Sequence, residues 1–325
     1  MQFLECINTA DKFYQVMKKT LNIRIMEQLK ELTASAIIGK HICLVNKPLL
    51  NLPDGADSFI CPFHVILFEK ACQPDWPLGC SENDFHELSV SFYSPGCKVP
   101  LCRNGNMRTI QYILVFSKML FVGSYFNIEV AAYTYWGYIE DEALHLSLKE
   151  KTILCRILND IEYELRVSDA YSRRLLCTHT CQLLEYCRRF YERQFYIRTN
   201  WNGEIITQFK RWLGSYIRHQ LPTLHCFPTE EEIAGKWNFS ANYLNDLLRV
   251  ETGKSIQEHI RFRQIEEAKL QIHNYGEMSI ADIAQNLGFL DIRTFQAVFK
   301  KMAGCFPEEY RKDISISVSK EHSYN

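Results

Sequence analysis

Hydrophobic positions between residues 228 and 312 recur in two similar segments. The first copy has apolar residues at Ile233, Ala234, Trp237, Tyr243, Leu244, Leu247 and Leu248. The second copy has them at Ile283, Ala284, Leu287, Phe289, Phe295, Val298 and Phe299. Ile233 and Ile283 are fifty residues apart, and Leu244 and Phe295 are fifty-one apart. A repeat at this period predicts a duplicated supersecondary unit.

Helix-starting and helix-ending residues divide each copy into two short helices. Residues placed to cap the start of a helix are Thr229 (with Glu232 three places on), Ser240, Ser279 and Asp291. Residues placed to end a helix or to form a tight turn are Gly253, Gly288 and Gly304. Two short helices joined by a tight turn are typical of a helix-turn-helix motif.

Longer helical patterns flank the first copy and join it to the second. Residues 204–220 carry one apolar face, formed by Ile205, Phe209, Leu213 and Ile217. A long connecting helix is predicted from Ser255 to Asn274, with Ile256, Ile260, Ile265, Ala268, Leu270 and Ile272 buried. The pattern therefore predicts an all-α C-terminal domain with two helix-turn-helix units joined by a long helix.

The motifs of this region carry a family resemblance. The ordered runs are Asn242-Tyr243-Leu244, Glu251 to Ser255, Ile265 to Lys269, Ile280 to Ala284, Leu287-Gly288-Phe289, Phe299-Lys300-Lys301, Gly304 and Pro307 to Arg311. Together they resemble the AraC/XylS family of bacterial transcription regulators over about a hundred residues. The resemblance implies sequence-specific DNA binding by two recognition helices. The alternative is a duplicated helical bundle that binds protein.

The preceding two-thirds of the chain have a different texture. After an amphipathic N-terminal extension (residues 1–32), short apolar runs at 41–50, 63–70 and 87–93 are separated by Pro and Gly turns, as in a β domain. The segment 88–96, which ends in Pro95-Gly96, is similar to the strand before the Pro-Gly turn of cupin-like sensor domains in this family. We therefore expect an α+β chain whose N-terminal part is a cupin-like β-barrel.

Helical periodicity returns from residue 144. Leu154, Leu158, Ile161 and Leu165 form one apolar stripe, and Leu175, Leu176, Leu183, Leu184 and Cys187 continue it in a second helix. The resemblance implies that these helices pair two subunits in a homodimer; the alternative is that they pack on their own barrel. The turn-forming segment 200–203 is the expected linker. The expected divisions are 1–143 (extension and sensing domain), 144–199 (dimerisation helices), 200–313 (DNA-binding domain) and 314–325 (a frayed tail).

Charge does not by itself indicate nucleic-acid binding. The formal net charge is −1, and residues 228–313 carry 11 Lys and Arg against 14 Asp and Glu. Seven Lys and Arg against two Glu lie just upstream, in residues 188–218. This balance of acidic and basic side chains is compatible with specific DNA binding by a few placed cations, but it argues against strong non-specific binding.

The sequence gives little indication of catalysis or metal binding. His64, His86 and Glu87 do not have the spacing of a cupin metal site, and the segment Cys177-x-His179-x-Cys181 would point its histidine away from the thiols on a helix. Thirteen cysteines without a Cys-x-x-Cys spacing are expected to be free thiols. We expect no catalytic residue, metal or cofactor. A cupin dioxygenase and a DNA-repair alkyl-acceptor with the same motif are the enzymatic alternatives.

The sides of the recognition helices opposite the apolar stripes are the candidate DNA contacts. They comprise Ser240, Ala241, Asn242, Asn245, Asp246 and Arg249 in the first unit, and Ile292, Arg293, Thr294, Gln296, Ala297 and Lys300 in the second. Asn and Gln pair with adenine, Arg with guanine, and Ile or Ala contact a thymine methyl, while Ser240 and Thr294 can hold phosphates. Asp246 and Ala297 depart from the Arg or Gln that is frequent in the family, which leaves their base contacts open.

The expected partners follow from this assignment. They are double-stranded DNA, a second copy of the chain, a small-molecule effector at the N-terminal domain, and RNA polymerase. The longest apolar stretch, residues 112–126, is interrupted by Lys118 and is too short to cross a membrane. With no basic-then-apolar leader at the start of the sequence, we expect a cytoplasmic protein.

Overall fold

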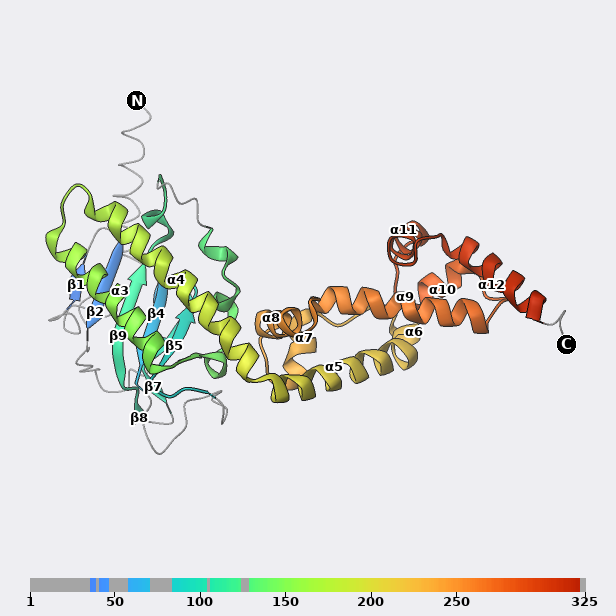
Figure 1. Cartoon of the computed structure of the whole chain (residues 1–325), viewed down its shortest axis with the longest axis horizontal. Coiled ribbons are helices and arrows are strands. Elements are labelled where there is room, and N and C mark those ends of the chain that lie inside the picture. Colours follow the sequence, from blue (N-terminus) through green and yellow to red (C-terminus); the bar gives the residue numbers. More distant parts are fainter. Residues whose placement is uncertain are drawn as a thin grey trace, which may run out of the picture. The chain divides into compact units, whose positions relative to one another are not determined.

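The computed structural model describes residues 36–38, 41–46, 58–70, 84–103, 106–123 and 129–321. The chain divides into two compact units, Met1–Ile197 and Arg198–Asn325, shown in Figure 1. The amphipathic extension expected at residues 1–32 lies outside the described residues. Each unit is described by itself below.

The first unit is built on a six-stranded antiparallel sheet. Its strand order is β1 (Ala36–Ile38), β2 (Ile42–Asn46), β9 (Ile110–Phe116), β4 (His64–Glu69), β5 (Leu88–Tyr93) and β10 (Leu144–Leu146). Two ribbons pair β3 (Ser58–Ile60) with β6 (Lys98–Pro100) and β7 (Cys102–Arg103) with β8 (Asn106–Met107). Within the described ranges, the sheet ends at β1 on one side and at β10 on the other. The expected β domain is therefore present as a sheet, while its closure into a barrel stays a prediction.

Both faces of this sheet are covered. One face contributes Val65, Leu67 and Ile113 to a core that includes Phe59 and Val99 of the β3–β6 ribbon. The other face carries an aromatic cluster, His64, Phe92, Phe116, Tyr135 and Trp136, whose rings contact one another. The last two belong to the 3₁₀-helix η3 (Thr134–Gly137). The other 3₁₀-helices of this unit are η1 (Lys118–Leu120), η2 (Val130–Ala132) and η4 (Glu140–Glu142).

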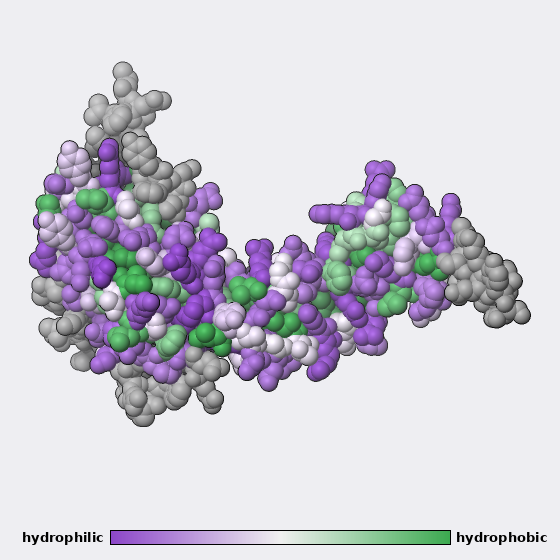
Figure 2. All heavy atoms as spheres, viewed as in Figure 1, coloured by the Kyte–Doolittle hydropathy of each residue, from purple (hydrophilic) through white to green (hydrophobic). Residues whose placement is uncertain are grey.

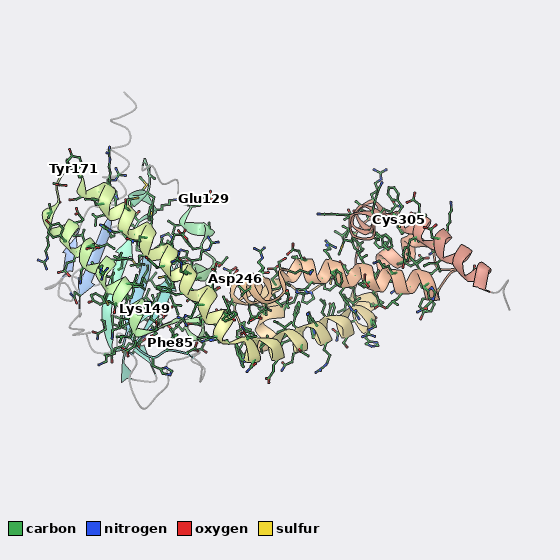
Figure 3. All side chains as sticks on the ribbon, in the orientation of Figure 1. Phe85, Glu129, Lys149, Tyr171, Asp246 and Cys305 are labelled. Carbon is green, nitrogen blue, oxygen red and sulfur yellow. The ribbon has the colours of Figure 1, made fainter. Side chains whose placement is uncertain are left out.

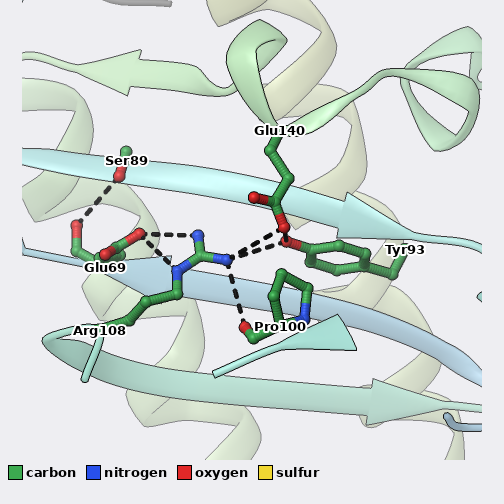
Figure 4. A network of polar contacts seen from close by, with 6 residues as sticks. All are labelled: Glu69, Ser89, Tyr93, Pro100, Arg108 and Glu140. Atoms are coloured by element: carbon green, nitrogen blue, oxygen red, sulfur yellow. Dashed lines mark hydrogen bonds and ion pairs between the residues drawn. The ribbon is translucent and has the colours of Figure 1, made fainter. Parts of the chain in front are cut away.

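A buried charge network ties the strand ends together (Figure 4). The Arg108 guanidinium donates to Glu69 at 2.7 and 3.0 Å and to the Tyr93 hydroxyl at 3.1 Å. It also lies 3.6 Å from Glu140. Burial raises the pKa of Tyr93 to about 12, so this hydroxyl stays protonated. Because the guanidinium is almost fully buried, the acidic partners are needed to keep its charge inside the unit.

Two antiparallel helices complete the first unit: α3 (Leu148–Val167), capped by Ser147, and α4 (Ser172–Ile197). The predicted stripe of α3 is buried; on α4, Leu175 is exposed, contrary to expectation. The α4 side chains are bonded to their own unit, because Gln194 accepts from the His145 N–H at 2.7 Å and Tyr191 donates to the Glu142 carbonyl at 3.1 Å. Packing on the parent sheet is thus observed, and dimerisation by these helices stays a prediction.

The second unit is all-helical in its described residues. Its helices are α5 (Thr199–His219), α6 (Leu221–Leu224), α7 (Glu230–Ala234), η5 (Gly235–Trp237), α8 (Ala241–Thr252), α9 (Ile256–Asn274), α10 (Ile280–Asn286), α11 (Ile292–Ala303) and α12 (Pro307–Glu321). The two expected helix-turn-helix units and the long joining helix are all present.

Three expectations about this unit were wrong. The predicted linker at 200–203 lies inside α5, and the chain leaves helical geometry only around Arg198. Leu270 is half-exposed on α9 because it lies beside the buried stripe of Ile265, Ala268 and Ile272. The tail that we expected to fray from residue 314 continues as helix α12 to Glu321.

Candidate nucleic-acid interface

The helix pairs α7/α8 and α10/α11 close their turns with the same hydrogen bond. In the first pair the Phe239 N–H donates to the Ala234 carbonyl at 3.2 Å, and in the second the Phe289 N–H donates to the Ala284 carbonyl at 3.0 Å. Both alanines are buried, which lets the two helices of each pair approach closely. The sequence repeat is therefore also a repeat of backbone geometry, and each copy is a helix-turn-helix unit.

Each turn passes through one residue in the left-handed conformation. These residues are Asn238 at φ 56° and Gly288 at φ 75°. Asparagine visits this region more readily than most residues. At Gly288 an added Cβ would also lie 2.9 Å from Leu221 Cδ1, so both the backbone and the available space favour glycine there.

Helix α8 has an apolar face toward the domain and a polar face away from it. Ser240 caps the helix by accepting the Tyr243 N–H at 3.1 Å, and Gly253 ends it in the left-handed conformation. The buried residues are Tyr243, Leu244, Leu247 and Leu248, as predicted. Of the candidate contacts, Asn242 and Arg249 are exposed, while Ala241 and Asp246 (Figure 3) are half-buried.

The start of α5 holds α8 in place. The Arg198 guanidinium donates to the Tyr243 hydroxyl at 2.9 Å, and the Asn202 amide donates to the Glu251 carboxylate at 2.7 Å. Arg198 and Asn202 are both buried. Sequence reasoning missed these two positioning residues because Asn and Gly near position 202 indicated a turn.

Asn245 is placed as a structural residue of the domain. Its amide nitrogen donates to Glu230 at 2.9 Å, and its amide oxygen accepts the Ile256 N–H at 3.0 Å, at the start of α9. One side chain therefore links α7, α8 and α9. Its contact with a DNA base stays a prediction, because these two bonds use one of the two amide N–H groups and one of the two oxygen lone pairs.

Helix α11 repeats this design with a different cap. The Asp291 carboxylate accepts the Thr294 N–H at 2.7 Å and the Thr294 hydroxyl at 2.6 Å, and these bonds lower the pKa of Asp291. Phe295 and Phe299 fill the buried face. The candidate contacts Ile292, Arg293, Thr294, Ala297 and Lys300 are exposed on this helix.

Two candidate contacts on α11 also touch the following segment. The Gln296 amide donates to Glu308 of α12 at 2.6 Å. The Lys300 ammonium lies 4.1 Å from the centre of the Phe306 ring. Gln296 occupies the position that Asn245 occupies in the first unit, fifty-one residues earlier, so both units anchor the recognition helix through an amide at this position.

Comparison with known proteins agrees with this geometry. A family model described as a helix-turn-helix domain matches residues 233–313. The chain is 35% identical over 83 residues to the Msm operon regulatory protein of Streptococcus mutans, covering 26% of this chain and 30% of that protein. It is 29% identical over 108 residues to regulatory protein SoxS of Salmonella typhimurium, covering 33% of this chain and 94% of SoxS. The C-terminal domain is an AraC-type helix-turn-helix domain.

A longer match reaches beyond this domain. The transcriptional activator RhaR of Yersinia pseudotuberculosis is 28% identical over 160 residues, covering 48% of this chain and 51% of RhaR. The chain thus spans about half or less of the lengths of RhaR and of the Msm operon regulatory protein.

In the AraC-type domain, helix α9 is bonded to both helix-turn-helix units. Its first N–H is held by Asn245 of α8, and the Gln264 amide near its middle donates to the Leu287 carbonyl at 2.6 Å, in the turn before α11. Its 19 residues give a length of roughly 28 Å. This length approaches the ~34 Å between successive major grooves on one face of DNA.

The structure adds three residues to the candidate surface of the AraC-type domain. Val250 and Lys301 are exposed at equivalent positions, each four residues after a candidate contact and on the same helical face. Extending the helical spacing by one turn would have identified both. Leu290, between the second turn and α11, is 99% exposed, and only the structure shows that exposure.

The two units of the AraC-type domain differ in charge. Residues 228–253 contain five acidic and two basic side chains, whereas residues 279–304 contain two acidic and three basic ones. The cations of the second unit, Arg293, Lys300 and Lys301, are all on α11 and exposed. Because phosphate contacts dominate affinity for DNA, the second unit is electrostatically the better suited of the two.

The search for metal sites and membrane-spanning helices covers the residues that the structure describes. His179 lies on α4 between the buried Cys177 and Cys181, and no group of three His, Cys, Asp or Glu that could hold a metal is found in the described ranges. A search of the same residues finds no helix with the length and apolar character needed to span a bilayer.

Proposed function

We propose that this chain is a sequence-specific DNA-binding transcription regulator that inserts α8 and α11 into successive major grooves. The observation that supports the proposal best is the duplicated turn geometry, together with the hydrogen bonds from α9 to both units. A helix-turn-helix places its second helix in the major groove, and a joining helix bonded to both copies would keep the two recognition helices at a set spacing.

Affinity in this proposal depends on a few placed cations. Arg293, Lys300 and Lys301 would contact phosphates or guanine around α11, whereas α8 offers Arg249 beside Asp246. Non-specific binding would then be weak, since the domain has no excess of positive charge. Sequence selectivity would come from the remaining exposed positions of the two helices.

The proposal assigns dimerisation to the first unit. Exposed apolar side chains gather where α3 and α4 meet: Tyr163, Val167, Tyr171 and Leu175. Tyr163 and Val167 are four residues apart on α3, and Tyr171, directly before α4, is four residues before Leu175 on that helix, so a second copy could cover them. A dimer would raise affinity by linking two DNA-binding domains. An effector at the first unit and contact with RNA polymerase rest on the family resemblance, and a cytoplasmic location and the absence of catalysis are further parts of the proposal.

The test is selection of bound duplexes from a random library by the full-length protein, followed by titration at several salt concentrations. We expect an enriched site with two half-sites about one helical turn apart, and an affinity that falls linearly on a log–log plot against salt. Removing both charges in the variant Lys300→Ala/Lys301→Ala should lower that slope by about 2. Lys149→Ala, which removes one charge at an exposed position of α3 in the first unit (Figure 3), is the control and should leave the slope unchanged. No enriched sequence and no salt dependence would refute the proposal.

A further inference from the structure

Leu290 is the one residue that the second helix-turn-helix unit has in addition to the first. The offset between the copies is fifty at Phe239 and Phe289, and fifty-one at Ser240 and Asp291. The added residue therefore lies between the end of the turn and the helix cap. Its two neighbours have structural contacts, because Phe289 packs on Phe295 and Asp291 caps α11.

Leu290 is exposed at the start of a recognition helix. Single exposed leucines are common on protein surfaces. Leu290, however, directly precedes the cap of a recognition helix, and the N-terminal residues of such a helix are those that reach base edges. Ile292, the first residue of α11, is also 38% exposed, and the exposed Arg293 follows it. In Figure 2 the surface around α11 is of mixed hydropathy, with pale green residues beside purple ones.

The major groove has one apolar group for such side chains to contact, the C5 methyl of thymine. We infer that Leu290 and Ile292 contact thymine methyl groups, so that the half-site bound by α11 requires thymine at one or two positions. This inference rests on the proposed function and adds the chemistry of the preferred base.

The first unit lacks an equivalent contact. There Ser240 follows Phe239 directly, and Ala241, at the position of Ile292, is small and half-buried. The half-site bound by α8 should therefore be less sensitive to the methyl group at the positions facing the start of that helix than the half-site bound by α11. The two half-sites differ in this respect even though the two units share one fold.

The experiment removes the methyl group from the DNA. Deoxyuridine replaces thymidine at each position of the selected site, one at a time, and the full-length protein is titrated against each duplex. We expect about fourfold weaker binding at one or two positions of the α11 half-site, the effect of one buried methyl-sized group. In Leu290→Ala or Ile292→Ala, the ratio of the affinities for the thymine and uracil duplexes should fall toward one at the matching position, because the shorter side chain loses most of the apolar contact.

Leu270→Ala is the matched control, since Leu270 is a half-exposed leucine on α9 of the same domain; it should keep the wild-type thymine-to-uracil ratio. Thermal unfolding of every variant checks that the fold is intact.

Three results overturn the inference. Leu290→Ala and Ile292→Ala could keep the wild-type ratio at every position, or uracil could have no effect anywhere in the α11 half-site. Leu290→Ala could also lower transcription while DNA affinity and the ratio stay unchanged, which would assign this side chain to a protein partner. Failure of the full-length protein to select any DNA is a different result, because it refutes the proposed function and the inference falls with it.

Discussion

A leucine introduced at Ala284 or at Ala297 separates the fold of the second unit from its reading of DNA. Ala284 is 2% exposed, and its carbonyl accepts the Phe289 N–H that closes the turn. Ala297 lies on the exposed face of α11. The substitution therefore adds the same three carbon atoms once at a buried contact between α10 and the turn, and once at a solvent-exposed position of α11.

The expected magnitudes differ accordingly. At Ala284 the larger side chain meets a joint filled by Phe289, whose ring lies 5.1 Å from that of Phe295. Overpacking of this kind costs about 1–3 kcal/mol, which corresponds to a fall in Tm of roughly 3–12 °C for a domain of this size. At Ala297 the substitution exchanges one strong helix former for another, so stability should change by less than about 0.5 kcal/mol.

The assay is thermal unfolding of the full-length variants beside titration on the selected site. We expect Ala284→Leu to lose specific binding while it keeps most of its helix content, because α7 and α8 form the first unit and do not contain the contact between Ala284 and Phe289. Ala297→Leu should keep the wild-type Tm and change only affinity or base preference. If Ala297→Leu melts the domain and Ala284→Leu does not, the buried and DNA-facing sides of α11 have been assigned the wrong way round.

Three further substitutions test other parts of the chain. Arg293→Ala should lose about 1–3 kcal/mol on the selected site and relax one base position, measured by titration against single-base variants. Asn202→Ala should leave the Glu251 carboxylate without its bond to α5 and lower the free energy of unfolding by about 1–3 kcal/mol in denaturant titration. Glu69→Gln should remove the charge paired with buried Arg108 and destabilise the first unit by about 3–5 kcal/mol, again by denaturant titration, whereas an unchanged midpoint would show that Glu140 suffices as partner.

Features that depend only on residues within one helical turn, such as helix caps, could be predicted from the sequence. The caps Thr229, Ser240, Ser255 and Ser279 each accept the N–H three residues on, as expected. These bonds need no distant partner, so residue type and spacing decide them. The buried stripes of the recognition helices were predicted for the same reason, except that Val298 of α11 is half-buried.

Features that depend on distant partners could not be predicted. Asn202 resembled a linker residue, yet it is buried and bonded to Glu251, 49 residues away. Arg108 gave no signal of its own, because its partners Glu69 and Tyr93 lie on β4 and β5, far from it in the sequence. Leu270 was expected to be buried but is half-exposed. A hydrophobic pattern locates the buried side of a helix only to within about one residue position.

The amides at Asn245 and Gln296 show how one position can have a structural role in two related copies at once. Each lies on the polar side of its recognition helix, where hydrogen-bonding side chains indicate base contacts. In the structure each amide donates to a glutamate of a neighbouring helix, Glu230 of α7 and Glu308 of α12, and its contact with a base stays a prediction. Because the two glutamates occupy unrelated places in the sequence, the shared role emerges only from the two sets of contacts. The side chains left exposed on the outer face then differ strongly, with Asp246 and Val250 in the first unit and Ala297 and Lys301 in the second. The repeat therefore preserves the way each recognition helix is held, while its outer surface is where the two units diverge, and selectivity between the two half-sites has to arise there.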